Sequence, residues 1–355
     1  MKMFHDTDIL EIESNLNSSL VKLSGKTILL TGAGGFLGRY FMELFRIFNE
    51  KPAFGPIRVI ALDNYVVGGD QKKSGESQRN SNIEWIYGDA SIAADLPDHF
   101  DYIIHAAGIA SPEHYRANPL QTIDVAVNVT KKLLEREKND NSRMLFFSSS
   151  EIYGDPDPAF VPTNEEYKGY VSIRGPRACY DESKRLGETL CWIYENYFKV
   201  HICVARPFNV YGPGMLPKDF RVLPNFAASI ARGESIKVYG HGRQTRTFCY
   251  ITDAITGFMK ILLDSTSPGV WNVGNPYPEI SITDLAYKIK EDIFPKISVD
   301  LVKYPESYPE DEPNRRCPDI SKIERDLKFS PKVSLDVGLS RFFEWTQKNY
   351  QSKNS

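Results

Sequence analysis

The chain has 355 residues, of which 41% are hydrophobic and 25% are charged, and its formal net charge is −3. These values are typical of a globular protein whose core needs no disulfide or metal, and they exclude a largely disordered chain. The nearly neutral balance gives no support for a nucleic-acid or membrane partner.

The N-terminal extension, residues 1–24, carries acidic residues throughout and has no continuous apolar stretch. It therefore predicts neither a signal peptide nor a membrane span. Ile9, Ile12 and Leu16 recur at helical spacing, which predicts a short helix packed on the body, with a disordered tail as the alternative. The five cysteines are scattered, odd in number and without CxxC spacing, so we predict reduced thiols, a cytoplasmic location and no metal site.

From residue 27 onward, short apolar runs alternate with longer stretches of helical periodicity. Such runs indicate strands of a parallel sheet that is buried on both faces, so the predicted fold class is α/β with a doubly wound sheet. Residues 25–205 would form the nucleotide-binding domain. Residues 206–355, richer in Pro, Gly and aromatic residues, would form mainly a smaller, discontinuous C-terminal substrate lobe, with segments returning to the first domain. The runs are "TILLTG", "RVIALD", "IEWIYGD", "DYIIHAA", "RMLFFSSS" and "VHICVAR".

The first apolar run leads into "GAGGFLG" and then into a helical pattern. Gly32, Gly35 and Gly38 permit a tight turn and let the backbone approach a pyrophosphate at the helix N-terminus. Phe36 and Leu37 lie between the last two glycines and share the predicted site. This arrangement predicts a Rossmann dinucleotide site, although a glycine-rich turn without a ligand is the alternative for the motif alone.

The second run ends in Asp63, followed by Asn64. An acid at this point can accept hydrogen bonds from the adenosine ribose and would repel a 2′-phosphate, so NAD is predicted rather than NADP. A helix cap or turn former is the alternative interpretation of Asp63. The remaining predicted cofactor positions follow the third and fourth runs and are Asp89, Ala90, Ala106 and Ala107.

Tyr180 and Lys184, in "ACYDESKR", lie four residues apart and therefore on one face of a predicted helix. An ammonium beside a phenol is expected to lower the phenol's pKa from about 10, so that Tyr180 can accept a hydroxyl proton while hydride leaves the same carbon. Ser149 ends a buried strand, at the edge where such sheets bind ligands, and its hydroxyl could hold the reacting oxygen. An ordinary helix surface and a serine-rich turn are the alternatives for each part taken alone.

These motifs, together with "SSSEIYGDP", "VARPFNVYGP", "YGHGRQTRTFCYITD" and "RRCPDI", resemble the extended short-chain dehydrogenase/reductase family over residues 25–345. This family contains nucleotide-sugar epimerases, dehydratases and decarboxylases, and the resemblance is closest to the UDP-glucuronate decarboxylases. It implies that NAD oxidises the sugar C4 hydroxyl, that the C5 carboxylate leaves as CO₂, and that hydride returns to C4. A 4-epimerase or another 4-keto-forming enzyme is the alternative, followed by a non-catalytic NAD-binding protein.

The resemblance also implies roles for further residues. Ser150 and Glu151 stand where the dehydratases carry an aspartate-glutamate pair, so water elimination lacks its expected acid. Glu151 would act as a general acid/base or order a water at C5, and an ion pair with an arginine is its alternative. Arg316 falls at the position of an active-site arginine, with Arg315 as the adjacent competitor. The residues expected to contact the nucleotide diphosphate or the base are Asn209, Arg221, Val238, Tyr239 and Arg246.

Two further expectations follow from the resemblance. The family usually has "NPIGPRACYDEGKR" where this chain reads "SIRGPRACYDESKR", which adds Arg174 near the sugar pocket and bears on substrate identity. Family members usually form homodimers through a four-helix bundle that includes the helix with Tyr180. The predicted dimer face, for which burial within the subunit is the alternative, comprises Leu186, Leu190, Ile193 and Tyr194.

Overall fold

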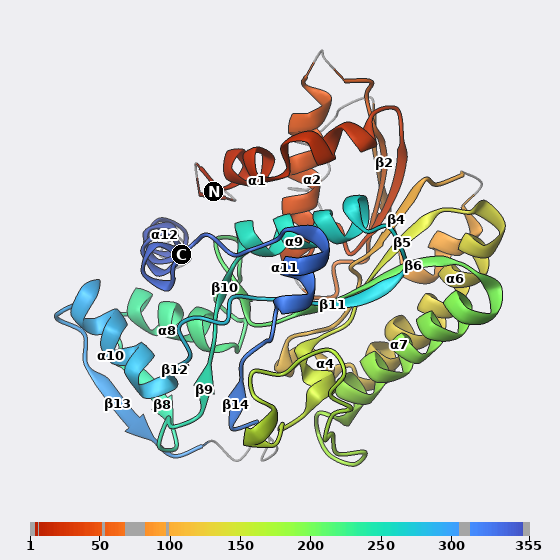
Figure 1. Ribbon diagram of the computed structural model, residues 1–355. Helices are drawn as coiled ribbons and strands as arrows, with labels where there is room; N and C mark the ends of the chain where they lie inside the picture. Colours follow the sequence, from red (N-terminus) through yellow and green to blue (C-terminus); the bar gives the residue numbers. More distant parts are fainter. Residues whose placement is uncertain are drawn as a thin grey trace.

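The computed structural model describes residues 4–5, 7–51, 54–67, 82–96, 99–304 and 313–350. At its centre is a seven-stranded sheet with the strand order β11-β6-β5-β4-β1-β2-β3 (Figure 1). All neighbouring strands are parallel, and the order reverses between β1 and β4. The predicted α/β class with a doubly wound parallel sheet is confirmed. The strands are β1 (Thr27–Thr31), β2 (Arg58–Asp63), β3 (Ile83–Tyr87), β4 (Tyr102–His105), β5 (Arg143–Phe147), β6 (His201–Pro207) and β11 (Gly269–Val273).

Successive apolar residues of the strands enter two different cores. Ile28 and Leu30 belong to the larger core, whereas Leu29 between them belongs to the other, because side chains alternate across a strand. Helices α2 and α9 cover the first face, and α6 and α7 cover the second (Figure 1). These four helices are α2 (Phe36–Asn49), α6 (Thr130–Asp140), α7 (Ala178–Phe198) and α9 (Ile251–Asp264).

Further helical segments connect the strands and pack around the sheet. None of the helices in the described ranges is both long and apolar enough to cross a membrane. The segments that precede α7 are α1 (Asp8–Leu16), η1 (Asn17–Leu23), η2 (Ala90–Asp95), α4 (Pro112–Ala117), α5 (Pro119–Asp124), η3 (Val125–Val129), η4 (Ser150–Tyr153) and η5 (Pro158–Phe160). Those that follow it are α8 (Val222–Ala231), α10 (Ile282–Asp292), α11 (Ser321–Leu327) and α12 (Leu335–Asn349).

Three small sheets lie beside the carboxyl end of the central sheet. The first pairs β7 with β10, the second has the order β12-β9-β14, and the third pairs β8 with β13. In the second sheet Arg316 of β14 lies opposite Arg246 of β9, which places two cations side by side. The strands are β7 (Val210–Tyr211), β8 (Ile236–Tyr239), β9 (Thr245–Arg246), β10 (Cys249–Tyr250), β12 (Ile280–Ser281), β13 (Val299–Val302) and β14 (Arg315–Arg316).

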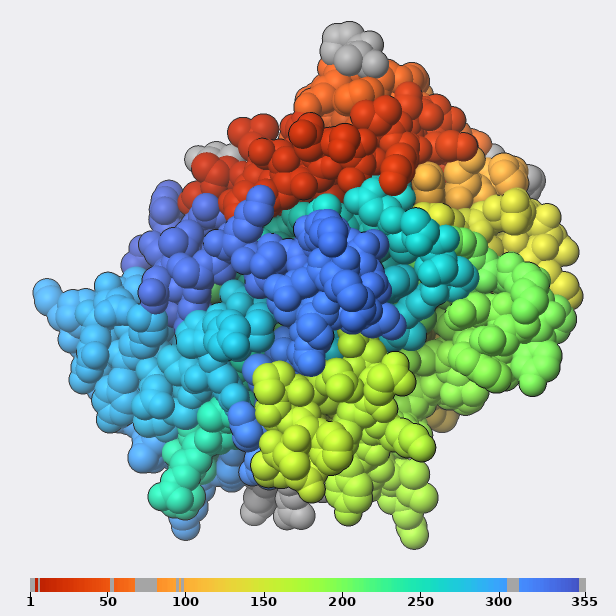
Figure 2. Space-filling model, in the orientation of Figure 1, coloured from red at the N-terminus to blue at the C-terminus, as the bar shows by residue number. Residues whose placement is uncertain are grey.

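The N-terminal helix α1 packs against the body of the protein. Ile9, Ile12 and Leu16 are buried in the larger core. In Figure 2 the red N-terminal segment lies directly on teal and blue segments from the C-terminal half of the chain. The regularly spaced apolar residues of α1 therefore pack against segments that are distant in sequence.

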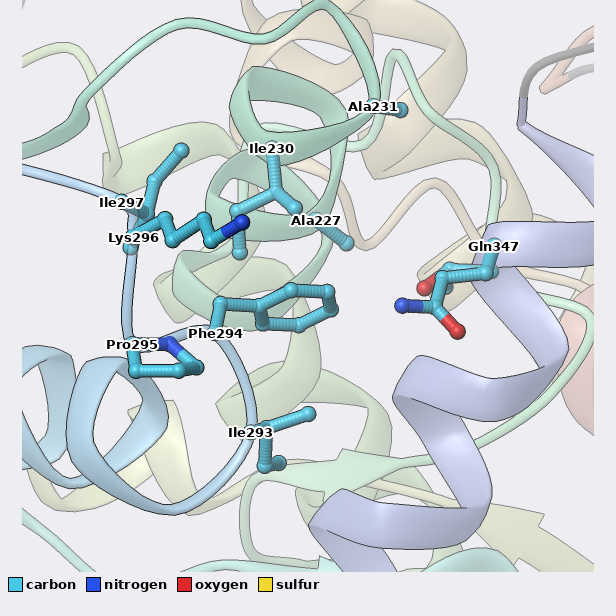
Figure 3. A pocket seen from close by; sticks show the side chains of 10 residues that line it. Ala227, Ile230, Ala231, Ile293, Phe294, Pro295, Lys296, Ile297 and Gln347 are labelled. Atoms are coloured by element: carbon cyan, nitrogen blue, oxygen red, sulfur yellow. The ribbon is translucent and has the colours of Figure 1, made fainter.

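A pocket of about 400 Å³ lies between α8, α12 and residues 293–297 (Figure 3). Its lining is mostly apolar and includes Ile230, Phe294 and Ile297, and the Lys296 side chain extends toward Ile230. None of the residues predicted to bind the cofactor or the substrate lines this pocket.

Candidate active site

The glycine loop passes directly over the end of the neighbouring strand β4. Gly32 has φ +74°, and a Cβ there would lie 2.6 Å from the Ala107 nitrogen and 2.7 Å from the Ala106 carbonyl carbon. A Cβ on Gly38 would lie 2.1 Å from the Gly32 oxygen. Since these neighbours are backbone atoms, neither position accepts a larger residue. The loop therefore brings the N-terminus of α2 close to the point where the strand order reverses, where such folds bind dinucleotides.

Asp63, at the carboxyl end of β2, holds this loop. Its carboxylate accepts hydrogen bonds from the Gly34 nitrogen at 2.8 Å and the Tyr65 nitrogen at 2.6 Å. The Asn64 side chain donates to Asp89 at 3.4 Å, and Asp89 caps η2. An acid beside a glycine cradle at a helix N-terminus fits the adenosine ribose and pyrophosphate of NAD. The other predicted residues at this edge are Gly35, Phe36, Leu37 and Ala90.

The structure brings together the three residues predicted for proton and hydride transfer. A hydrogen bond joins the side chains of Ser149 and Tyr180. Lys184, one turn along α7, donates to the Phe147 carbonyl oxygen at 2.7 Å, and its Nζ lies 5.9 Å from the centre of the Tyr180 ring. The Tyr180 ring stacks on Tyr115 of α4, with ring centres 5.4 Å apart. The phenol is therefore fixed from both sides at the carboxyl end of β5.

The electrostatics of this group differ from the prediction. Burial raises the pKa of Tyr180 to about 12, although its hydrogen bond with Ser149 acts in the opposite direction. Burial also lowers the pKa of Lys184 to about 8, and the Lys184 charge together with burial lowers that of His105 to about 3. The prediction that the phenol's pKa lies below its ordinary value is wrong for this structure. The reason is that removal from water penalises the phenolate, while the ammonium is directed at the Phe147 carbonyl.

Glu151, which lies in η4, is held by two guanidinium groups. Arg316 donates to its Oε2 at 2.7 Å, and Arg177 donates to the same oxygen. Burial raises the pKa of Glu151, but Arg316, Arg177 and Arg246 outweigh it and hold the pKa below its ordinary value. The ion pair that the sequence left as the alternative for Glu151 is therefore present, and the residue is a largely but not fully buried carboxylate anion. Ser150 is buried beside it at the start of η4.

The two adjacent arginines of β14 point to different partners. Arg315 donates two hydrogen bonds, at 2.8 and 2.7 Å, to the Glu279 carboxylate. Arg316 instead contacts Glu151, and its Nε is buried without a hydrogen-bond partner in the described part of the chain. Of the two arginines, Arg316 is therefore the one that contacts Glu151.

The predicted substrate-binding residues are partly gathered at the same edge. Arg221 caps α8, lies 5.9 Å from the Phe36 ring centre and forms an ion pair with Asp219. Its charge also acts on the Tyr180 phenol. Asn209 donates to the Thr247 carbonyl oxygen at 2.8 Å. Arg221 therefore lies near the start of α2 and acts on Tyr180, and its binding of a diphosphate stays a prediction.

Val238 and Tyr239, which were predicted to flank the nucleotide base, differ in whether their side chains are accessible. Val238 has no exposed surface and belongs to the larger core, whereas the Tyr239 ring stacks on Tyr304 with centres 6.0 Å apart. The Val238 side chain therefore cannot contact a ligand, which corrects that part of the prediction. Tyr239 remains the aromatic side chain of the pair that can do so.

Three further residues lie at the site that the sequence did not predict: Tyr115, Arg177 and Asp181. Arg177 contacts both Glu151 and Asp181, and the latter contact is an i,i+4 pair that the sequence displays. The Tyr115 hydroxyl is buried and has no hydrogen-bond partner among the described residues. Its stacking on Tyr180 depends on the packing of α4 against α7, which no local pattern indicates.

The reversed strand order, the glycine cradle with Asp63, and the gathering of Ser149, Tyr180 and Lys184 define an NAD-dependent enzyme. A sequence model of the NAD dependent epimerase/dehydratase family matches residues 28–274. The chain belongs to this family.

Relatives match over most of the chain. UDP-glucuronic acid decarboxylase 6 of Arabidopsis thaliana is 39% identical over 327 residues, which cover 92% of this chain and 90% of the relative. UDP-glucuronic acid decarboxylase 1 of Xenopus tropicalis is 36% identical over 327 residues, or 92% of this chain and 73% of the relative. A dTDP-glucose 4,6-dehydratase from Streptomyces venezuelae, solved with NAD bound, has the same fold: its TM-score is 0.78 at 23% identity, with 91% of this chain and 97% of that chain covered.

Proposed function

We propose that this protein converts UDP-glucuronate to UDP-xylose and CO₂ through a transient 4-keto sugar. The observation that carries the proposal is the meeting of Tyr180, Lys184 and Ser149 with a carboxylate and an arginine, Glu151 and Arg316, at one edge of the sheet. The relatives named UDP-glucuronic acid decarboxylases, at 36 to 39% identity over most of the chain, support the same reaction.

The cradle of Gly32, Gly38 and Asp63 would hold NAD, which when bound supplies an acceptor for the C4 hydride and later returns it. Tyr180 would accept the proton of the C4 hydroxyl, while Ser149 holds that oxygen against the phenol. Because its pKa is about 8, Lys184 is mostly protonated at neutral pH and keeps a positive charge beside the ring. This charge favours the phenolate when the proton is transferred.

Once C4 is a ketone, the C5 carboxylate is β to it. The bond between C5 and the carboxylate then breaks, CO₂ leaves, and the electron pair delocalises into an enolate. Arg316 would bind the departing carboxylate before this step. The Glu151 carboxylate would order a water at C5 and relay a proton from solvent through it to that carbon. Hydride returns to C4 and Tyr180 gives back its proton, so no net oxidation occurs.

Incubation of the protein with NAD and UDP-glucuronate tests the proposal. The expected products are CO₂ and a UDP-pentose, seen by mass spectrometry as the loss of one CO₂. A product of unchanged mass would indicate a 4-epimerase instead. Tyr180→Phe should reduce turnover by about 10²- to 10⁴-fold because the proton acceptor is lost, while bound NAD is retained. Tyr197→Phe, on the exposed surface of the same helix, is the matched control. Turnover of the Tyr180→Phe protein at the wild-type rate would remove this mechanism.

We further propose that the protein is a cytoplasmic homodimer. Tyr194 is buried in the subunit core, so its predicted place on the dimer face is wrong. Leu190 and Ile193 are partly buried and pack against that core, and their place on the dimer face stays a prediction. Leu186 of α7 is exposed, and Leu120 of the adjacent α5 is 81% exposed. An apolar surface of this kind favours association of two copies. All five cysteines are unpaired, as expected in a reducing compartment.

Sedimentation velocity tests the dimer. The wild-type protein should sediment as a dimer, and a Leu120→Glu/Leu186→Glu double variant as a monomer, because buried charges oppose association. Val337→Glu, on the exposed surface of α12, is the control. A monomeric wild-type protein at micromolar concentration would overturn the proposal.

A further inference from the structure

Arg177 connects two acids, the buried Asp181 and the largely buried Glu151, next to the reacting phenol. Its Nη2 donates to Glu151, and its Nε lies 3.4 Å from Oδ2 of Asp181. Asp181 directly follows Tyr180 on α7, and Glu151 is two residues beyond Ser149, which hydrogen-bonds Tyr180. One guanidinium group is therefore shared by two carboxyl groups that both lie close to the proposed proton acceptor.

Asp181 is the less well satisfied of the two acids. Its side chain is 9% exposed, and its Oδ1 is buried with no hydrogen-bond partner among the described residues. Glu151 receives a second guanidinium group from Arg316, whereas no second cation forms an ion pair with Asp181 in the described ranges. A buried carboxylate oxygen without a partner favours the protonated acid.

We propose that Asp181 is a positioning residue that controls Glu151 by competing with it for Arg177. The inference rests on the decarboxylase function proposed above, in which Glu151 exchanges a proton at C5. When Asp181 is protonated, Arg177 is committed to Glu151 and holds it as an anion. When Asp181 is ionised, Arg177 is divided between the two acids, and the added negative charge favours protonation of Glu151.

The surroundings of Asp181 support a change of charge near neutral pH. Burial and the Glu151 charge raise the pKa of Asp181 to about 7, against the opposing effects of Arg177 and Arg316. The charge of Asp181 in turn raises the pKa of Tyr115 and of Tyr180. Ionisation of Asp181 therefore acts on the two groups proposed to transfer protons, Tyr180 and Glu151. The titratable and charged groups that face it are Glu151 of η4, Arg177 before α7, Arg316 of β14, Tyr115 of α4, and Cys179 and Tyr180 of α7.

Asp181→Asn tests the inference, because an amide oxygen can still accept from Arg177 but cannot ionise. In the wild-type enzyme, kcat for UDP-glucuronate should change severalfold across about pH 7. This change reports the coupled titration of Asp181 and Glu151 together. The Asn variant should lose this inflection, with no more than about a threefold change in KM and with NAD still bound. Glu182→Gln, at the next position and only half-buried, should keep the wild-type profile. Superimposable profiles of the wild-type and Asn proteins would overturn the inference.

A second measurement does not depend on turnover. Infrared difference spectra between about pH 6 and pH 8 should show the loss of one more protonated carboxyl in the wild-type and Glu182→Gln proteins than in Asp181→Asn. Asp8 and Asp253, whose pKa values are about 6, contribute equally to all three proteins. If the wild-type protein releases no CO₂ from UDP-glucuronate, the proposed function fails whether or not this signal is seen. If the wild-type protein turns over but neither its pH profile nor its infrared signal responds to Asp181→Asn, the inference fails and the function stands.

Should the Asn variant not fold, Arg177→Lys offers a second test, because it keeps the positive charge but removes the geometry that bridges the two acids. This variant should also shift the inflection in the pH profile, and an unshifted profile would then overturn the inference.

Discussion

Asp8 is a fully buried acid and Glu151 a largely buried one, but phenols surround the first and guanidinium groups the second. Asp8 accepts hydrogen bonds from the hydroxyls of Tyr40 at 3.1 Å and Tyr250 at 3.0 Å, and Arg341 lies 3.7 Å away. Burial raises its pKa to about 6 in spite of these contacts. The arginines around Glu151 instead hold its pKa below the ordinary value. Neutral donors thus leave a buried acid able to take up a proton, whereas guanidinium groups keep it ionised.

The difference corresponds to where each acid lies. Asp8 begins α1 and joins it to Tyr40 of α2 and Tyr250 of β10, so its contacts fix the N-terminal helix on two distant parts of the fold. Glu151 lies two residues from Ser149 at the proposed active site. The polar contacts of Asp8 therefore serve packing, whereas the charge of Glu151 is available for chemistry.

Glu151→Gln should have the largest effect of the substitutions that test this contrast. It removes the ionisable group but keeps the shape, so turnover of UDP-glucuronate should fall by about 10²- to 10⁴-fold if Glu151 exchanges a proton at C5. Steady-state kinetics measure this, and thermal unfolding with NAD present checks that the variant is folded. Glu166→Gln, on an exposed part of the loop that follows, is the matched control. A loss of less than about threefold would mean that the carboxylate serves only its ion pairs.

The sequence predicted the fold well, because strands buried on both faces read as continuous apolar runs. It did not single out β11 as a strand of the central sheet, since "GVWNV" is short, contains Gly and Asn, and finds its place only by pairing with β6. The residues of the glycine loop, Ser149, Tyr180 and Lys184 are recognisable because strand ends and helix spacing alone position them.

The rest of the site depends on packing between elements that are distant in sequence. Arg316 reaches Glu151 because β14 pairs with β9, and Tyr115 reaches Tyr180 because α4 packs on α7. The direction of the Tyr180 pKa was predicted wrongly for the same reason. The lysine four residues away is visible in the sequence, but the burial that outweighs it is not.

Asp8→Asn tests the other half of the contrast through stability, with a smaller expected effect. The folded protein holds the Asp8 proton more tightly than the unfolded chain does, with a pKa of about 6 against 3.8. Its contribution to stability is therefore fully present below about pH 4 and is lost as the pH rises through about 6, a change of about 3 kcal/mol in the free energy of unfolding. The Asn variant cannot titrate and should lack this decline. Urea unfolding at a series of pH values measures the difference between the two proteins.

The exposed Asp300→Asn serves as its control and should keep the wild-type pH dependence. Other buried acids, such as Asp253 with a pKa raised by burial to about 6, contribute equally to both proteins and cancel in the comparison. Parallel stability curves for the wild-type and Asp8→Asn proteins would show that Asp8 stays ionised, as Glu151 does, and the contrast would disappear.

Tyr250→Phe should have the smallest effect and separates hydrogen bonding from packing at Asp8. The ring remains in the core, but one of the two phenolic donors is lost, so the pKa of Asp8 should rise further. A hydrogen bond to a charged acceptor contributes about 1.5–3 kcal/mol and one to a neutral acceptor about 0.5–1.5 kcal/mol. The loss of unfolding free energy should therefore be larger at about pH 8, where Asp8 is ionised, than at about pH 5, where it is mostly protonated. Tyr277→Phe, at an exposed ring, should cost little at either pH. An equal cost for Tyr250→Phe at both pH values would mean that its hydroxyl does not sense the charge of Asp8, and that the helix is held by the apolar contacts of Ile9, Ile12 and Leu16 alone.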